Sequence, residues 1–137
     1  MTTCAGLADT YAAAFPQSRA WSVGEFQTLL NTPHVQVFGT DISFAIVQSV
    51  IDAAEVITLA THPIHQKKGL AAANLALVIN HGQKQGWDRI FLDVAADNHA
   101  ALALYSRFDF QTVARRAGYY NRTNGQRVDG LILEKRL

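Results

Sequence analysis

At 137 residues, with 49% hydrophobic and 17% charged side chains, the chain is long enough for one compact domain and short for two, and its composition excludes a disordered protein. No apolar run approaches the roughly 20 residues of a membrane helix. The formal net charge is +1 with acids and bases interspersed, so the chain lacks the positive field that tight nucleic-acid binding requires.

We therefore expect one soluble domain over residues 1–137 that binds neither membrane nor nucleic acid. The single cysteine, Cys4, has no partner for an internal disulfide, and the first residues lack the basic-then-apolar pattern of a signal peptide. A reducing cytoplasm is the expected location.

The first part of the chain predicts two helices. Apolar residues at helical spacing predict a helix over residues 3–15, which Pro16 ends. The Ser-x-x-Glu pattern from Ser22 to Glu25 is a capping box, and it predicts a second helix that ends near residues 31–33.

The rest of the chain predicts a sheet with further helices. Apolar runs over residues 35–38 and 42–50 flank a turn-like Gly39-Thr40-Asp41 and predict an antiparallel hairpin. Strands and helices then alternate, with two strands at the end, over residues 55–61, 69–85, 89–95, 98–108, 110–115 and 130–134. We expect an α/β domain with a mixed, mostly antiparallel sheet of six to seven strands and about four helices on its two faces.

The turn before the third predicted helix is the first candidate site. It reads Gln66-Lys67-Lys68-Gly69-Leu70-Ala71 and is followed by Ala72. A helix N-terminus presents unpaired N–H groups and a positive dipole end, which suit a pyrophosphate. Gly69 would let the backbone approach the anion, and the two lysines add charge. The alternative is an ordinary strand-to-helix connection with solvated lysines.

Asp93 is the second candidate. It is the one charged residue in Ile90-Phe91-Leu92-Asp93-Val94-Ala95, a run that fits a strand buried on both faces. Burial disfavours the charged form of a carboxylate, so Asp93 is a candidate general base. The alternative is a structural carboxylate held by backbone or arginine partners.

Asn98 and Tyr105 lie seven residues apart on the next predicted helix, close to two full turns, so one ligand could contact both. Each also has a structural explanation. Asn98 could cap the helix, and Tyr105 could be a core aromatic residue.

The turn is similar to the Gln/Arg-x-x-Gly-x-Gly/Ala motif of the GCN5-related N-acetyltransferase (GNAT) family. The preceding Ala60-Thr61-His62-Pro63 resembles the Val-x-Pro-like segment of that family. The resemblance implies that the turn binds the pyrophosphate of the donor, acetyl-CoA. It further implies that the backbone of Leu59, Ala60 and Thr61 holds the pantetheine arm.

The pattern from Asp93 to Tyr105, followed by Phe110, is similar to the second half of the same family. The resemblance implies that Asn98 contacts the coenzyme and that Tyr105 faces the thioester sulfur. It also implies direct acetyl transfer to a primary amine, with Asp93 accepting the ammonium proton through water and Tyr105 protonating the thiolate.

Within the family, the chain resembles the bacterial ribosomal-protein-alanine N-acetyltransferases. The segments that carry this likeness are Ala14-Phe15-Pro16, Trp21-Ser22, Leu92-Asp93-Val94, Asn98, Ala103-Leu104-Tyr105, Asp109-Phe110 and Tyr119-Tyr120. The resemblance implies that the acceptor is the N-terminal alanine of a small-subunit ribosomal protein. Trp21, Tyr119 and Tyr120 are then candidate acceptor-binding residues, although the tyrosine pair could equally belong to a solvated loop.

The chain departs from the family pattern at several positions. Asp93 stands where the family usually has glutamate, and Ala71 stands where glycine is commoner. Asp109 replaces the glycine of Gly-Phe at the helix C-terminus, where a left-handed conformation is required. Counted from Gly125, the segment Gln126-Arg127-Val128-Asp129 holds one extra residue relative to Gly-Arg-Glu-Asp, so the loop after Tyr120 is expected to differ.

Two rival interpretations stay open, because the chain departs from the family pattern and because few residues indicate the acceptor. The acceptor could be another N-terminus, or a lysine or small amine, or the domain could bind acetyl-CoA without catalysis. A metal site is not expected, because a proline separates His62 from His65 and no third ligand lies near in sequence.

Overall fold

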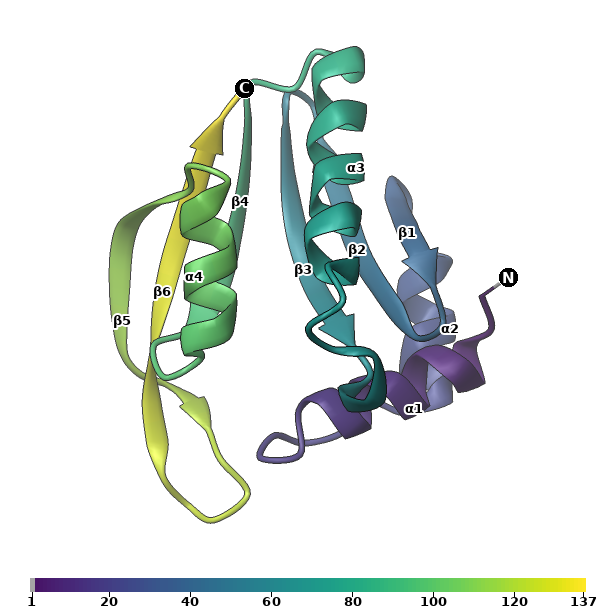
Figure 1. Cartoon of the computed structure of the whole chain (residues 1–137), viewed down its shortest axis with the longest axis vertical. Helices are drawn as coiled ribbons and strands as arrows, with labels where there is room; N and C mark the ends of the chain where they lie inside the picture. The colour runs from purple at the N-terminus through teal and green to yellow at the C-terminus, as the bar shows by residue number, and fades with distance from the viewer. Residues whose placement is uncertain (1) are drawn as a thin grey trace.

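A computed structural model describes residues 2–137 as an open, twisted sheet covered by helices on both faces (Figure 1). The strands are β1 (Val35–Thr40), β2 (Ser43–Val50), β3 (Ala53–Thr61), β4 (Arg89–Ala95), β5 (Gln111–Asn121) and β6 (Arg127–Arg136). The helices are α1 (Cys4–Ala14), α2 (Val23–Leu30), α3 (Leu70–Gln85) and α4 (His99–Arg107), with a short 3-10 helix, η1 (Pro63–His65). The strand order is β1-β2-β3-β4-β6-β5, in which only the β3–β4 pair is parallel.

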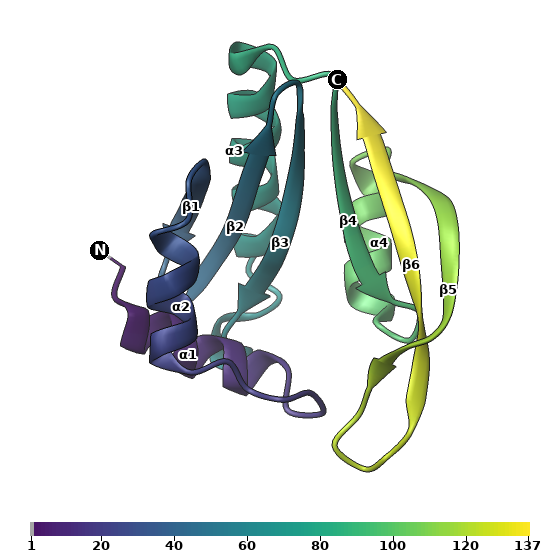
Figure 2. The same ribbon diagram turned by 180° about the vertical axis from the view of Figure 1, so that it is seen from behind.

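The two faces of the sheet have separate apolar clusters. Helices α3 and α4 cover one face, and α1 and α2 cover the other face over β1 to β3 (Figure 2). The cluster beneath α3 and α4 includes Val47, Val56, Leu75, Val78, Ile90, Leu92 and Leu133. The cluster beneath α1 and α2 includes Leu7, Phe26, Phe44, Ile46 and Ala60. The predicted α/β class, strand number and two-sided helix cover are confirmed.

Local signals explain where the helices begin and end. The predicted capping box is present at α2, where the Ser22 hydroxyl accepts from the Glu25 N–H and the Glu25 carboxylate accepts from the Ser22 N–H. At the end of α4, Asp109 adopts the left-handed φ of 66° that was expected. The N–H of Phe110 donates to the carbonyl of Tyr105 at 3.0 Å, which completes a Schellman motif.

The central strands β3 and β4 pair over only four residue pairs, from Ala53 with Arg89 to Val56 with Leu92. A β-bulge follows immediately on β3, because Ile46 pairs with Thr58 and Val47 with Val56, which leaves Ile57 as the extra residue. A bulge bends its strand and increases the local twist. The two halves of the sheet therefore diverge beyond Val56, as Figure 1 shows.

The last two strands are longer than predicted. Residues 110–115 and 130–134 were expected, whereas β5 and β6 extend into a hairpin that closes near Arg122 and Gln126. Most of β5 is exposed, so its residues lack the alternation of apolar and polar side chains that signals a strand. The backbone register with β6 also shifts between Arg116 and Tyr120, around Gly118 at a φ of 59°.

Helix α3 supplies a stability test at Gly82. An alanine in an exposed helix position normally stabilises relative to glycine by about 1 kcal/mol. A Cβ at Gly82 would overlap the buried Trp87 ring and lie 2.9 Å from Leu137 Cδ1. We expect Gly82→Ala to lower the free energy of unfolding by about 1–3 kcal/mol in urea denaturation. The control Asn80→Ala, at an exposed position of α3, should raise it by about 0.5 kcal/mol. A gain in stability for Gly82→Ala would contradict this packing.

Candidate active site

Two cavities open where β3 and β4 part. The first, here called the strand cavity, has a volume of about 480 Å³. Its lining includes Tyr11, Gln17, Ser18, Trp21, Thr58, Asp93, Asp97, Tyr120 and Arg122. The second, here called the turn cavity, has a volume of about 460 Å³. Its lining includes Ala60, Thr61, Gln66, Lys67, Gly69, Leu70, Ala71 and Ala72. Leu59, Asn98 and Tyr105 line both, so the two cavities meet at these residues.

The turn before α3 has the backbone conformation of an anion site. Lys67 and Gly69 have φ values of 64° and 78°, and Gly69 is the N-cap of α3 without any side-chain cap. The first N–H groups of α3, on Leu70, Ala71 and Ala72, therefore have no partner within the helix. A Cβ at Gly69 would meet no atom within 4 Å, so the glycine is required by its φ, and the space in front of it is free for a ligand.

The side chain of Gln66 attaches this turn to the end of β3. Its amide nitrogen donates to the Thr61 carbonyl oxygen at 3.1 Å. The Thr61 hydroxyl lies 2.8 Å from the Ser43 hydroxyl, which accepts from the buried amide of Asn74 on α3 at 3.0 Å. These contacts hold Leu59, Ala60 and Thr61 beside the first turn of α3, and the edge of β3 beyond Val56 is not paired with β4. Their backbone groups on that edge are available to an extended ligand.

Asp93 is the first residue of β4 beyond the last pair with β3. Its neighbours Leu92 and Val94 belong to the core beneath α4, so the side chain of Asp93 projects toward the other face and lines the strand cavity. The Oδ1 atom is buried and has no hydrogen-bond partner within residues 2–137. A buried carboxylate oxygen without a partner is costly, which is the arrangement expected where a ligand or water supplies the missing donor.

The charge of Asp93 acts on two neighbouring groups. Burial raises the pKa of Tyr120 to about 12, and the negative charge of Asp93 adds to this rise. The pKa of Glu55, on β3, is also raised, mainly by burial and to a smaller extent by the charge of Asp93. Tyr120 therefore remains a neutral hydrogen-bond donor in the strand cavity at physiological pH.

Tyr105 and Asn98 lie at the junction of the two cavities. Tyr105 is 5% exposed and packs against Phe110, with ring centroids 5.4 Å apart. Burial raises its pKa well above the usual value, and the nearby Tyr120 adds to this. The Oδ1 of Asn98 accepts from the Ala101 N–H at 3.2 Å, so the residue does cap α4. Both structural explanations thus hold, and both residues also reach the cavities.

Of the candidate acceptor-binding residues, Trp21 and Tyr120 line the strand cavity and Tyr119 lines neither cavity. Trp21 stacks on Tyr11 with ring centroids 4.3 Å apart. Tyr119 is 46% exposed. The Arg116 guanidinium lies over its ring, with Cζ 5.0 Å from the ring centroid. Its assignment to the acceptor site stays a prediction.

Sequence reasoning missed several residues of the strand cavity, among them Tyr11, Ser18, Asp97 and Arg122. They belong to three separate segments, and no spacing pattern connects them. The signal available in the sequence was the extra residue in the loop after Tyr120, which marked the hairpin as unusual without identifying Arg122.

Neither a metal centre nor a membrane span is evident in the part of the chain that the structure describes. Within residues 2–137, no three His, Cys, Asp or Glu side chains gather in a way that could hold a metal ion. His62 and His65 have ring centroids 6.2 Å apart. Across the same residues, no helix has the length and apolar character needed to cross a bilayer.

An open sheet that parts over two joined cavities, with a glycine-capped helix N-terminus beside one of them, defines an acetyltransferase of the GNAT type. The chain belongs to the acetyltransferase (GNAT) family, whose model matches residues 12–110. The resemblance and the enzyme class inferred from the motifs are therefore confirmed.

Individual relatives have names that specify one acceptor, which the family description does not. The chain is 36% identical over 123 residues to the [ribosomal protein bS18]-alanine N-acetyltransferase of Escherichia coli K12. The aligned region covers 89% of this chain and 82% of that protein. It is 32% identical to the enzyme of the same name from Haemophilus ducreyi, over 82% and 81% of the two chains.

Solved structures agree in fold. The ribosomal-protein-S18-alanine N-acetyltransferase of Escherichia coli superimposes with a TM-score of 0.87 and 29% identity, covering 97% of this chain and 86% of that one. Arabidopsis thaliana NAA60, solved in complex with acetyl-CoA, has a TM-score of 0.81 and 21% identity, covering 98% and 93%.

The raised pKa of Tyr120 predicts a loss of stability at alkaline pH. Burial raises the pKa of its phenol to about 12 in the folded protein from an ordinary value of 10.0, so between these values the folded state keeps a proton that the unfolded state releases. The contribution to stability is complete below pH 10 and is lost as the pH rises toward 12. Tyr120→Phe should therefore flatten the fall in the free energy of unfolding across this window, measured by urea denaturation. An identical slope in the variant and the wild type would contradict the burial of this phenol.

Proposed function

We propose that this protein transfers the acetyl group of acetyl-CoA to the N-terminal alanine of a small-subunit ribosomal protein in the cytoplasm. The observation that carries the proposal is the meeting of the two cavities at Leu59, Asn98 and Tyr105. A donor that enters along the turn cavity and an amine that enters along the strand cavity would meet beside Tyr105. The choice of acceptor is supported by the curated relatives at 36% and 32% identity.

The donor would be held mainly by backbone groups. The N–H groups of Leu70, Ala71 and Ala72, at the positive end of the α3 dipole, suit the pyrophosphate, and the exposed Lys67 and Lys68 add charge at the rim. The open edge of β3 at Leu59, Ala60 and Thr61 suits the amide groups of the pantetheine arm. Asn98 would contact the coenzyme where the cavities join.

Bound acetyl-CoA supplies a thioester carbonyl that an amine can attack. The nitrogen lone pair forms the C–N bond, and the C–S bond breaks with its electron pair moving to sulfur. Asp93 would accept the ammonium proton, with a bridging water compensating for a side chain one methylene shorter than glutamate. Tyr105 would donate its phenolic proton to the thiolate and regain a proton from the nitrogen as the amide forms, and a backbone N–H near Leu59 would polarise the carbonyl. Holding both substrates at the junction of the cavities would contribute much of the rate.

Peptide acetylation tests the acceptor. We expect mass spectrometry to detect one added acetyl group on the α-amine of short peptides with a free N-terminal alanine. The matched control peptide has a blocked N-terminus and an internal lysine, and it should stay unmodified. Acetylation of the lysine peptide alone would contradict the N-terminal assignment. Binding of acetyl-CoA by calorimetry without acetylation of any peptide would instead support a domain that binds the coenzyme without catalysis.

Substitution at the two proposed catalytic residues tests the mechanism. Asp93→Ala and Tyr105→Phe should each lower kcat by about 10²- to 10⁴-fold, because each removes one proton-transfer group. The Kd for acetyl-CoA, measured by calorimetry, should stay within about threefold of the wild type for Asp93→Ala, since Asp93 does not line the turn cavity. Full turnover in both variants would show that the proposed roles are wrong.

A further inference from the structure

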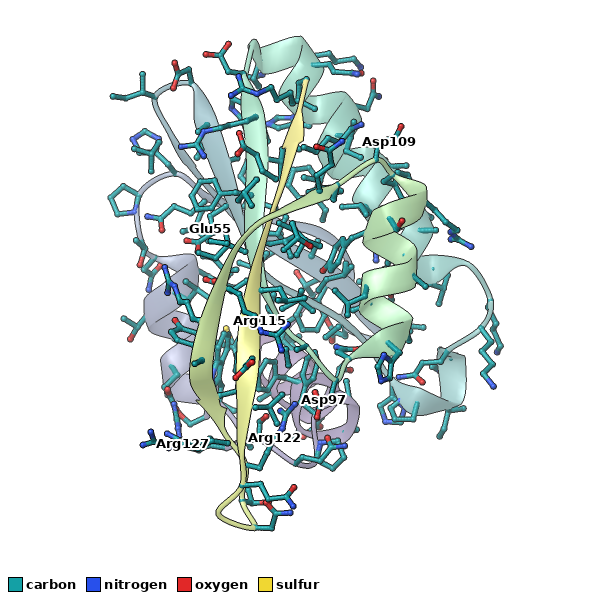
Figure 3. The ribbon with its side chains drawn as sticks, turned by 90° about the vertical axis from the view of Figure 1, so that its left-hand side faces the viewer. Glu55, Asp97, Asp109, Arg115, Arg122 and Arg127 are labelled. Atoms are coloured by element: carbon teal, nitrogen blue, oxygen red, sulfur yellow. The ribbon has the colours of Figure 1, made fainter. Side chains whose placement is uncertain are left out.

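Arg122, in the hairpin between β5 and β6, is a charged residue that the structure largely buries. Its side chain is only 14% exposed. One guanidinium nitrogen donates to the Ser18 hydroxyl at 3.1 Å, and another donates to the Asp97 carboxylate at 2.5 Å. Figure 3 shows Arg122 and Asp97 together at the base of the hairpin, whereas Arg127 lies apart from them. Burial of an arginine with two polar partners indicates a specific contact, because arginine is rarely buried unless it is paired.

The partners of Arg122 belong to the two halves of the parted sheet. Ser18 lies in the connection between α1 and α2, which packs with the β1–β3 half, and Asp97 lies in the connection between β4 and α4. The backbone strengthens the bridge, because the N–H of Thr123 donates to the Gln17 carbonyl oxygen at 2.9 Å. The halves pair directly only through four residue pairs of β3 and β4, at the far end of the opening. Arg122 and Thr123 therefore join the halves at their open end.

This bridge forms part of the wall of the strand cavity. Gln17, Ser18, Asp97 and Arg122 all line that cavity, together with Asp93 and Tyr120. None of these six residues lines the turn cavity. A change in the bridge would therefore alter the path by which an amine reaches Asp93 and leave the donor cavity intact.

We propose that Arg122 is a positioning residue that holds the hairpin against the α1–α2 connection and so defines the acceptor entrance. The proposal rests on the proposed function in placing the acceptor in the strand cavity. The forked guanidinium matters because its two terminal nitrogens reach different partners. A lysine at this position would keep the charge near Asp97 but lacks the second nitrogen that reaches Ser18.

Steady-state kinetics with the full chain test the proposal. Arg122→Ala should raise the KM for the acceptor by about 5- to 20-fold through loss of charge-assisted hydrogen bonds, and leave the KM for acetyl-CoA within about twofold. Arg122→Lys should recover part of the acceptor KM. The control Arg127→Ala removes an exposed arginine of the same hairpin that lines neither cavity, and it should leave both KM values unchanged.

A double-mutant cycle with Asp97→Asn provides a second readout. Because the two side chains form one ion pair, the acceptor KM of the double variant should match that of Arg122→Ala. The proposal would be overturned if the effects of Arg122→Ala and Asp97→Asn on the acceptor KM were additive. It would also be overturned if Arg122→Ala had the acceptor KM of Arg127→Ala, or if it raised the KM values of acceptor and acetyl-CoA equally. The acceptor in these assays is whichever amine the wild type acetylates. The role of Arg122 can therefore be tested even if that amine is not an N-terminal alanine.

Amide hydrogen exchange tests the bridge without any activity. In Arg122→Ala the Thr123 N–H, which donates to Gln17, should exchange at least about tenfold faster, while amides of β3 and β4 keep their wild-type rates. Unchanged exchange at Thr123 would overturn the proposal, and faster exchange throughout β3 and β4 would show general destabilisation in its place.

Discussion

The parting of β3 and β4 beyond Val56 and Leu92 is the constraint on which the site depends. Backbone groups that leave a strand ladder need other partners, and a parallel pair that stops early leaves an open edge facing a gap. The bulge at Ile57 turns β3 away at this point, and β4 stays paired with β6 to Ala95. The gap is therefore built into the sheet, and both cavities, Asp93 and the open edge of β3 follow from it.

The chemical groups beside the gap are side chains carried by the sheet and by α4. Asp93 brings a buried carboxylate oxygen that has no hydrogen-bond partner among residues 2–137, and Tyr105 and Tyr120 bring phenols whose pKa values burial raises. The same burial that makes these groups costly for folding makes them suited to acid and base roles.

The donor and acceptor sides are built in different ways. The proposed donor side is local, since Gln66 to Ala72 form one turn whose φ values and helix dipole suit an anion with little help from distant side chains. The acceptor side is assembled from remote segments, and Arg122 contacts Ser18 across 104 residues of sequence. A change in the length of the hairpin loop would therefore move groups that line the strand cavity.

Most of the elements and the turn of the proposed donor site could be predicted from the chain, because helical periodicity, the Ser22 capping box, the Asp109 cap and the glycine turn are local patterns whose physics acts within a few residues. It also indicated Asp93, since a lone charge in an apolar strand stands out. Three features could not be predicted and come from the tertiary fold: the strands part at Ile57, Tyr119 lies outside the cavities while Tyr120 lines one, and Arg122 bridges the two halves. These features depend on a bulge, a register shift and contacts between distant segments, which leave no periodic signal in the chain.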